Sequence, residues 1–119
     1  IAEVGPLPVA AHFHDTRGTG LANVSAALDC GVRHFDASLA GIGGCPFAPG
    51  ATGNIVMDDL CFMLDSMGLE TGVDLEQLIA IRELVRAALP DIEMHGAIAR
   101  AGLPAHYVNA KTRNATAAA

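Results

Sequence analysis

Residues 7–39 read LPVAAHFHDTRGTGLANVSAALDCGVRHFDASL, and the order of patterns in this stretch predicts the fold class. Residues 7–14 form a short, nearly continuous apolar run, which is typical of a strand buried on both faces of a parallel sheet. Residues 21–30 repeat apolar side chains at helical spacing, and the glycine that follows can end a helix. A second strand is expected at 32–39. This order predicts parallel strands joined by a crossover helix.

The alternation continues beyond a loop at 40–53, where glycine and proline are too frequent for a regular element. An amphipathic helix is expected at 58–67, because its apolar residues follow the i, i+3, i+4, i+7 pattern. A very short strand is expected at 70–73. The next helix is predicted to start after Asp74, which can cap it, and to end at Pro90. Strands and helices thus alternate as in α/β proteins.

The length of the chain limits this α/β fold to part of a barrel. A complete (β/α)₈ barrel takes roughly 250 residues, whereas the chain has 119. We therefore expect residues 1–107 to be the C-terminal portion of a TIM barrel, with parallel strands and crossover helices, and its first strands to lie upstream of Ile1. A weaker helix is expected to reach about Arg100. Residues 108–119 have too little apolar content to pack and are expected to be a frayed or disordered tail.

Composition excludes several classes of partner. The net charge of −6, without a cluster of Lys and Arg, argues against nucleic acid. Polar residues interrupt every apolar run before about 18 residues, so no membrane span is expected. Cys30, Cys45 and Cys61 are irregularly spaced, which argues against a disulfide framework and favours a reducing, cytoplasmic compartment. The charge does not exclude a small anionic ligand, because a bound cation can invert the local electrostatic field.

The pair His12 and His14 stands at the end of the first expected strand. Alternate residues of a strand share a face, so both imidazoles should point the same way. Catalytic groups of parallel barrels gather at this end of the strands, and two imidazoles so placed can hold one metal ion. A pair of partly buried histidines, each hydrogen-bonded to its neighbours, is the alternative that the sequence alone leaves open.

Cys45 is the cysteine best placed for chemistry. It lies in the glycine-rich loop GIGGCPFAPGATGN at 41–54, where glycines allow close approach to a ligand and closure of the loop. A thiol in such a loop can act as acid, base or nucleophile, and an incidental loop thiol is the alternative. Cys30 and Cys61 lie near or within helices and are expected to be structural.

Two further polar residues have two interpretations each. Asn54 follows the loop and precedes the helix at 58–67, so its amide can cap that helix or serve as a neutral oxygen ligand; its position favours the cap. Asp36 lies near the end of the second expected strand. It can orient a ligand or be a hydrogen-bonded structural aspartate.

Three stretches together resemble the 3-hydroxy-3-methylglutaryl-CoA lyase family of the DRE-TIM metallolyases: HFHDTRGTGLAN, FDASLAGIGGCPFAPGATGN and DLCFMLDSMGLETGVDLEQL. The similarity runs from about Ala11 to about Leu89. The pattern GxGGCPxAPGxxGN is a signature of high specificity, and its distance from HxHDT also agrees. The chain is therefore similar to a metal-dependent TIM-barrel lyase.

The resemblance implies that Mg²⁺ or Mn²⁺ is bound by His12, His14 and Asn54, with a further aspartate upstream of this chain. The implied reaction is a retro-Claisen-type cleavage of an acyl-CoA, a small-molecule substrate, to acetyl-CoA and acetoacetate. Cys45 would protonate or shield the enolate carbon as the loop closes, and His12 would also act as a proton shuttle. A homo-oligomer agrees with the resemblance, although no interface pattern is evident.

One departure from the family pattern broadens the substrate range. The better-known lyases tend to carry a glutamate four residues after the loop asparagine, where this chain has Asp58. A citramalyl-CoA-type substrate therefore remains an alternative. A second hypothesis is a synthase of the same superfamily, although such a synthase is not expected to have the GGCP loop. An inactive truncated fragment is a third, because a barrel without its upstream strands cannot close.

Overall fold

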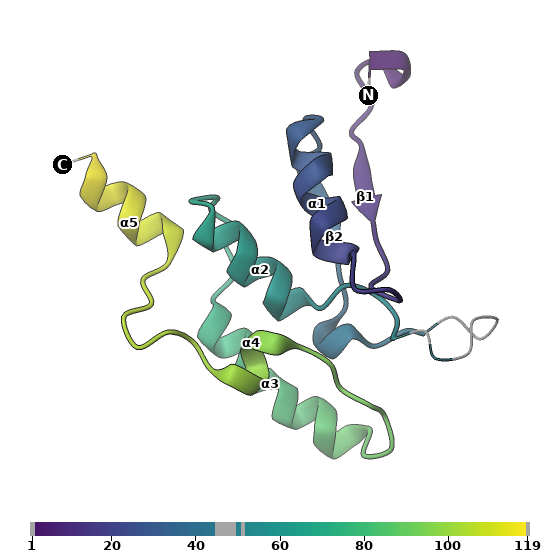
Figure 1. The fold of residues 1–119 in the computed structure, drawn as a ribbon. Coiled ribbons are helices and arrows are strands. Elements are labelled where there is room, and N and C mark those ends of the chain that lie inside the picture. The colour runs from purple at the N-terminus through teal and green to yellow at the C-terminus, as the bar shows by residue number, and fades with distance from the viewer. Residues whose placement is uncertain (1, 45–49, 51, 119) are drawn as a thin grey trace.

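Figure 1 shows the computed structural model of the chain, which describes residues 2–44, 50 and 52–118. Its helices and strands are, in order, η1 (Ala2–Val4), β1 (Ala10–His12), α1 (Gly20–Asp29), β2 (His34–Asp36), η2 (Leu39–Gly41), α2 (Met57–Ser66), α3 (Leu75–Ala88), α4 (Ala97–Ala101) and α5 (Ala110–Ala117).

β1 and β2 form a parallel pair connected by α1, which confirms the predicted crossover (Figure 1). The register places Ala10 opposite His34 and His12 opposite Asp36. The core lies between one face of this pair and the helices. Its fully or nearly fully buried members are Val24, Ile55 and Leu60, and the partly buried side chains packed against them include Phe13, Phe35, Leu28 and Met63.

The segment before α2 extends the small sheet at the ends of β1 and β2. Ile55 is fully buried, and its N–H donates to the carbonyl of Phe13 over 3.1 Å. The Ile55 carbonyl accepts from the N–H of Ser38 over 3.2 Å. Isolated bridges join His14 to Asn54 and Ser38 to Val56. Asn54 is therefore held where the two strands end, close in sequence to the glycine loop.

Three aspartates of α2 hold the later helices. The Asp58 carboxylate accepts from Arg82 of α3 over 2.6 Å. The two carboxylate oxygens of Asp59 accept from the N–H groups of Ala97 and Ile98, at the start of α4. The Asp65 carboxylate accepts from the N–H of Ala110, at the start of α5, over 2.5 Å. α2 thus organises the C-terminal half of the chain.

The sequence expectation of a frayed or disordered tail at 108–119 differs from the structure, which has α5 there. This helix has little apolar surface, so its apolar content gave no signal. Its first turn is instead satisfied by polar groups, because Asn109 accepts from the N–H of Thr112 and Asp65 accepts from the buried Ala110. Capping rather than an apolar stripe orders this segment.

The short strand expected at 70–73 is wrong, because these residues form neither a strand nor a helix. Gly72 takes a left-handed φ of 74°, and the Thr71 hydroxyl accepts from the N–H of Val73 over 3.2 Å. A local turn therefore replaces the strand ladder. β1 and β2 are also shorter than the expected 7–14 and 32–39, since each has three residues paired in the ladder.

The molecule is flatter and more open than a compact domain of its size. Its radius of gyration is 15.6 Å and its extents are 48 × 42 × 21 Å, whereas a compact chain of this length has about 13.5 Å. Large apolar side chains remain uncovered, with Leu84 at 70% and Leu7 at 67% exposure. This is the surface expected of a piece cut from a larger core. Among the described residues, none of the helices has the length and apolar character needed to cross a membrane.

Candidate active site

His12 and His14 lie together at the end of β1. Their ring centroids are 5.1 Å apart and their planes are inclined by 60°. Phe13 between them packs into the core, so the two imidazoles project from the opposite, uncovered face. The same-face arrangement predicted from the HxH spacing is therefore present. His12 Nδ1 lies 2.8 Å from the carboxylate of Asp36 on β2.

Asn54 lies beside this pair through its bridge with His14. Residues that face each other across an antiparallel bridge project to the same side, with their Cβ atoms about 5 Å apart. The Asn54 amide nitrogen donates to the carbonyl of Ile42 over 2.9 Å, which fixes the orientation of the amide. Its Oδ1 is buried and has no hydrogen-bond partner among the described residues. An unpartnered buried oxygen is costly unless a ligand satisfies it.

The capping role that sequence position favoured for Asn54 is wrong. α2 begins at Met57, and Val56 occupies its N-cap without a side-chain hydrogen bond. The bridge to His14 keeps Asn54 outside the first turn of the helix. The oxygen-ligand reading is the one that the geometry of Asn54 fits.

The described part of the glycine loop wraps closely around Asn54. A Cβ on Gly43 would lie 2.6 Å from the Asn54 amide nitrogen, and a Cβ on Gly53 would lie 2.6 Å from the Gly41 carbonyl oxygen. Gly43 and Gly53 also take φ values of 109° and 101°, where a side chain is strained. Close contacts and backbone conformation thus explain why the pattern has glycine at these two positions. Cys45, the predicted catalytic thiol, lies outside the described residues.

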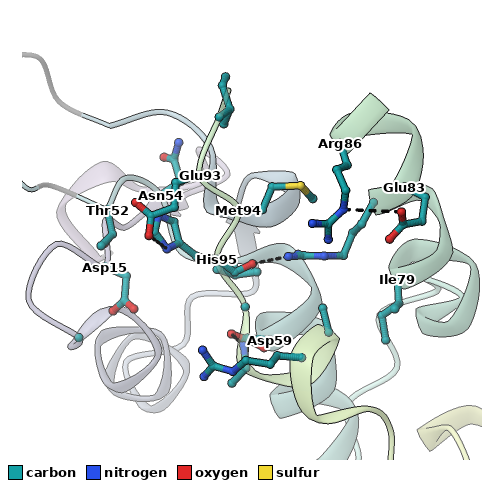
Figure 2. Close-up of a pocket in the computed structure, with 18 of the residues that line it drawn as sticks. Asp15, Thr52, Asn54, Asp59, Ile79, Glu83, Arg86, Glu93, Met94 and His95 are labelled. Carbon is teal, nitrogen blue, oxygen red and sulfur yellow. Dashed lines mark hydrogen bonds and ion pairs between the residues drawn. The ribbon is translucent and has the colours of Figure 1, made fainter. Parts of the chain in front are cut away.

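A cleft of about 830 Å³ opens beside Asn54 (Figure 2). Asp15 and Thr52 line it near Asn54, and α3 and the segment 90–97 form its other wall. Positive charge in the lining comes from Arg82, Arg86 and Arg100, and negative charge comes from Asp15, Asp59, Glu83 and Glu93. Neither His12 nor His14 lines this cleft. Asn54 is therefore the predicted ligand that belongs to both the histidine face and the cleft.

A buried ion pair in the wall of the cleft was missed by sequence reasoning. Asp58 is fully buried and accepts from Arg82, whose other terminal nitrogen donates to the His95 carbonyl over 2.6 Å. The His95 N–H donates to the carbonyl of Ala40 over 2.8 Å. Burial raises the pKa of the Asp58 carboxyl above its ordinary value, although the Arg82 charge opposes this. Two lone charges 24 residues apart on separate helices offer no sequence signal of this pairing.

The two described cysteines differ from each other. Cys61 is buried in α2, and burial raises the pKa of its thiol, as expected of a structural cysteine. Cys30 is exposed at the end of α1. In the described part of the chain, no group of three or more His, Cys, Asp or Glu side chains is placed to hold a metal ion.

Comparison with known proteins identifies the family. The model of the HMGL-like family matches residues 1–85. The chain is 54% identical to a hydroxymethylglutaryl-CoA lyase of Pseudomonas mevalonii over 86 residues, which are 70% of this chain and 29% of that protein. It is 52% identical to an (R)-citramalyl-CoA lyase of Chloroflexus aurantiacus over 81 residues, which are 68% of this chain and 26% of that protein.

The fold agrees with a solved HMG-CoA lyase of Acinetobacter baumannii, determined with coenzyme A and 3-methylmalate. The TM-score is 0.74 at 45% identity, and the match covers 83% of this chain and 32% of that one. This confirms the predicted fold class, part of a TIM barrel with parallel strands. The chain spans less than a third of the length of these relatives. Since the family model covers well over half of its residues, the chain belongs to the HMGL-like family.

Proposed function

We propose that the protein carrying this chain is a metal-dependent carbon–carbon lyase that cleaves 3-hydroxy-3-methylglutaryl-CoA to acetyl-CoA and acetoacetate. The observation that carries this proposal is the grouping of His12, His14 and Asn54. Two imidazoles stand on one face, and the bridge to His14 brings an asparagine with an unpartnered oxygen beside them. This set occurs in a chain about half identical to hydroxymethylglutaryl-CoA lyases.

Enzymes of this family depend on a metal ion. We assign its protein ligands in this chain to His12, His14 and Asn54. Two imidazoles with a neutral oxygen leave room for further oxygen donors, which suits Mg²⁺ or Mn²⁺. When bound, such an ion supplies Lewis-acid polarisation of the substrate oxygens. The unpartnered Asn54 oxygen is the feature of the described residues that fits this role.

The remaining roles belong to side chains of the chain itself. His12 would serve in turn as ligand and proton shuttle: when its Nε2, the ring nitrogen that does not face Asp36, is released from the ion, it would accept the proton of the substrate hydroxyl. Loss of that proton lets the C–C bond break, which gives acetoacetate and the carbanion equivalent of acetyl-CoA. The Cys45 thiol would deliver a proton to that carbon. The glycines around it allow the loop to close and exclude water.

The cleft beside Asn54 is the proposed position of the acyl-CoA. Its volume of about 830 Å³ is in the range of small-molecule sites. Arg86 and Arg100 lie in its lining, where guanidinium groups can pair with phosphates of the CoA part. Asn54 lies at the end next to the histidines, where the acyl part would react. Asn54 supports this placement, because it lines the cleft and is also bridged to His14.

A citramalyl-CoA-type substrate is the second candidate, favoured by 52% identity to an (R)-citramalyl-CoA lyase. The aspartate at position 58 does not distinguish the two. Asp58 is fully buried against Arg82, so its shorter side chain concerns packing between α2 and α3. Substrate choice must therefore come from other residues of the complete site.

We place the protein in the cytoplasm, as for the relatives of mouse and rat that are named cytoplasmic, although a macaque relative is named mitochondrial. We propose no nucleic-acid or membrane partner, since the net charge is −6. Assembly into a homo-oligomer is part of the same proposal. We also propose that residues 1–107 form the C-terminal portion of the barrel.

The experiment is a cleavage assay on the full-length protein with 3-hydroxy-3-methylglutaryl-CoA and citramalyl-CoA as competing substrates. We expect acetoacetate release that requires Mg²⁺ or Mn²⁺ and disappears with a chelator. Cys45→Ala should lower kcat by two to four orders of magnitude, the usual range for a proton-transfer group. Cleavage that survives both the chelator and this substitution would reject the proposal, and faster turnover of citramalyl-CoA would select the second candidate.

A further inference from the structure

Asp36 is placed against His12 by the register of the sheet. The two residues are partners in the parallel pairing of β1 and β2, so their side chains leave the same face of the sheet. The distance from His12 Nδ1 to Asp36 Oδ1 is 2.8 Å. Backbone pairing, and not chance contact of two surface side chains, therefore brings the carboxylate to this ring nitrogen.

This contact determines which nitrogen of His12 is available. An ionised carboxylate only accepts hydrogen bonds, so the Nδ1 that faces Asp36 carries the hydrogen. A neutral imidazole with its hydrogen on Nδ1 has its lone pair on Nε2. Nε2 is thus the atom left to bind a cation or accept a proton.

His14 lacks this arrangement. No hydrogen bond to its side chain occurs within residues 2–44, 50 and 52–118, although its ring lies 5.1 Å from that of His12. The carboxylate of Asp36 therefore distinguishes one imidazole of the pair from the other.

We propose that Asp36 is a positioning residue, which fixes the tautomer and ring orientation of His12 so that Nε2 would be free to hold the metal. This inference rests on the proposed function. Metal-binding histidines almost always donate their second ring N–H to a carboxylate, carbonyl or water, and loss of that partner typically lowers metal affinity 10- to 100-fold.

A merely structural ion pair makes a different prediction. The His12 and Asp36 side chains are 54% and 67% exposed in this chain, and exposed ion pairs add little to stability. If the pair were only structural, its removal would leave metal affinity unchanged. A measurement of metal affinity therefore distinguishes the positioning role from a purely structural ion pair, and no turnover assay is needed.

The test uses the full-length protein, as wild type, Asp36→Ala, Asp36→Asn and the control Asp29→Ala. Asp29 is an exposed aspartate at the end of α1. Mn²⁺ affinity is measured by electron paramagnetic resonance of the free ion, and the His12 tautomer by nitrogen NMR of the metal-free protein. We expect Asp36→Ala to raise the Kd for Mn²⁺ 10- to 100-fold and to mix the tautomers. Asp36→Asn keeps an accepting oxygen and should recover part of the affinity.

Unchanged Mn²⁺ affinity and tautomer in Asp36→Ala, with wild-type melting, would overturn the positioning role while the lyase proposal stands. Wild-type protein that binds Mn²⁺ through an Asp36-dependent site but cleaves no acyl-CoA would support the positioning role and reject the lyase. Wild-type protein that binds no Mn²⁺ would overturn both. A fall in affinity of the same size in Asp29→Ala would also count against a specific role of Asp36.

Discussion

At the scale of single residues, the interpretation of the predicted site depends on whether Asn54 is a helix cap or a ligand. From sequence it was better explained as a helix cap, and the structure gives that position to Val56 instead. Periodicity locates where a helix begins only to within a residue or two, which is the distance that separates a cap from a ligand. The unpartnered oxygen depends on a bridge to His14, forty residues earlier in the chain, and no local pattern encodes it.

Asn54→Ala should weaken metal binding more than it weakens the fold. The substitution removes the buried Oδ1 and one hydrogen bond, to the Ile42 carbonyl. Loss of that bond costs about 1 kcal/mol of unfolding free energy, whereas loss of a ligand should lower Mn²⁺ affinity at least about tenfold. Denaturant unfolding and Mn²⁺ titration of the full-length protein measure the two effects. A large loss of stability with intact Mn²⁺ affinity would contradict the ligand assignment.

Gly53→Ala should destabilise the protein more than Gly18→Ala. Both glycines take positive φ values, of 101° and 70°, so both substitutions carry the strain of a left-handed residue, about 1–2 kcal/mol. A Cβ at Gly53 would also meet the backbone of Gly41 at 2.6 Å, whereas nothing lies within 4 Å of a Cβ at Gly18. The unfolding free energies of the two variants measure the difference. Equal losses would show that the loop yields around Gly53.

At the scale of elements, the order of strands and helices was predictable and their lengths were not. The helices expected at 21–30 and 58–67 are present within one residue of those limits, because each carries a continuous apolar stripe. Asp74 caps α3 as predicted, with its carboxylate accepting from the N–H of Gln77. The strand predicted at 70–73 was wrong, because the left-handed conformation of Gly72, and not the apolar content, determines the backbone there.

The cap at α3 gives that helix a pH dependence. Hydrogen bonds from the backbone and side chain of Gln77 lower the pKa of Asp74 from its ordinary value of 3.8. A carboxyl with a lowered folded-state pKa stabilises the fold above its unfolded-state pKa, and this contribution disappears as pH falls through the folded-state value. Asp74→Ala should therefore destabilise the protein at pH 7, and the loss should shrink as pH falls below 3.8 and through the folded-state pKa. Unfolding at pH 7 and across the acid range tests this, and a loss that does not change with pH would exclude the charged cap.

The Asp58–Arg82 pair should be intolerant of losing one partner. Asp58 is fully buried and the Arg82 side chain is 8% exposed, so Asp58→Ala leaves a cation uncompensated in the wall of the cleft. The expected cost is about 3–5 kcal/mol of unfolding free energy. Removing both partners, as in Asp58→Leu with Arg82→Met, should recover much of it. A double-mutant cycle by denaturant unfolding measures the coupling, and additive losses would show that the ion pair is not the linkage between α2 and α3.

Asp65 should control the order of α5 without affecting chemistry. Its carboxylate accepts from the N–H of Ala110, and Arg113 of α5 donates to the Asp65 backbone carbonyl. Asp65→Ala removes the first contact, so amide exchange across Ala110–Ala117 should accelerate to the rate of a frayed segment. Asp65→Asn, which keeps an accepting oxygen, is the matched control. Fast exchange in the wild type would instead restore the sequence expectation of a disordered tail.

At the scale of the whole molecule, the sequence indicated a barrel portion through its length, which is too short for eight strands, and through the nearly continuous apolar run at 7–14. The uncovered face of the paired strands is partly polar, because His12 and Asp36 lie on it. In the structure one face packs on helices while apolar residues elsewhere, such as Leu84 and Ile81, stay exposed. What periodicity could not supply was the shape of that surface, because it depends on how α2 orients α3, α4 and α5.

The open apolar surface leads to a prediction for the chain by itself. A protein of this size rarely leaves large apolar patches uncovered unless they are interfaces. Expressed alone, residues 1–119 should bind a hydrophobic dye strongly and unfold with low cooperativity, while the full-length protein should do neither. The isolated chain should also bind Mn²⁺ far more weakly, because His12, His14 and Asn54 supply only part of an octahedral shell. Dye fluorescence, thermal melting and Mn²⁺ titration of the two proteins test this. If the isolated chain melts sharply, binds no dye and holds Mn²⁺ as tightly as the full protein, then its exposed face needs no covering, and the barrel-portion argument loses its physical basis.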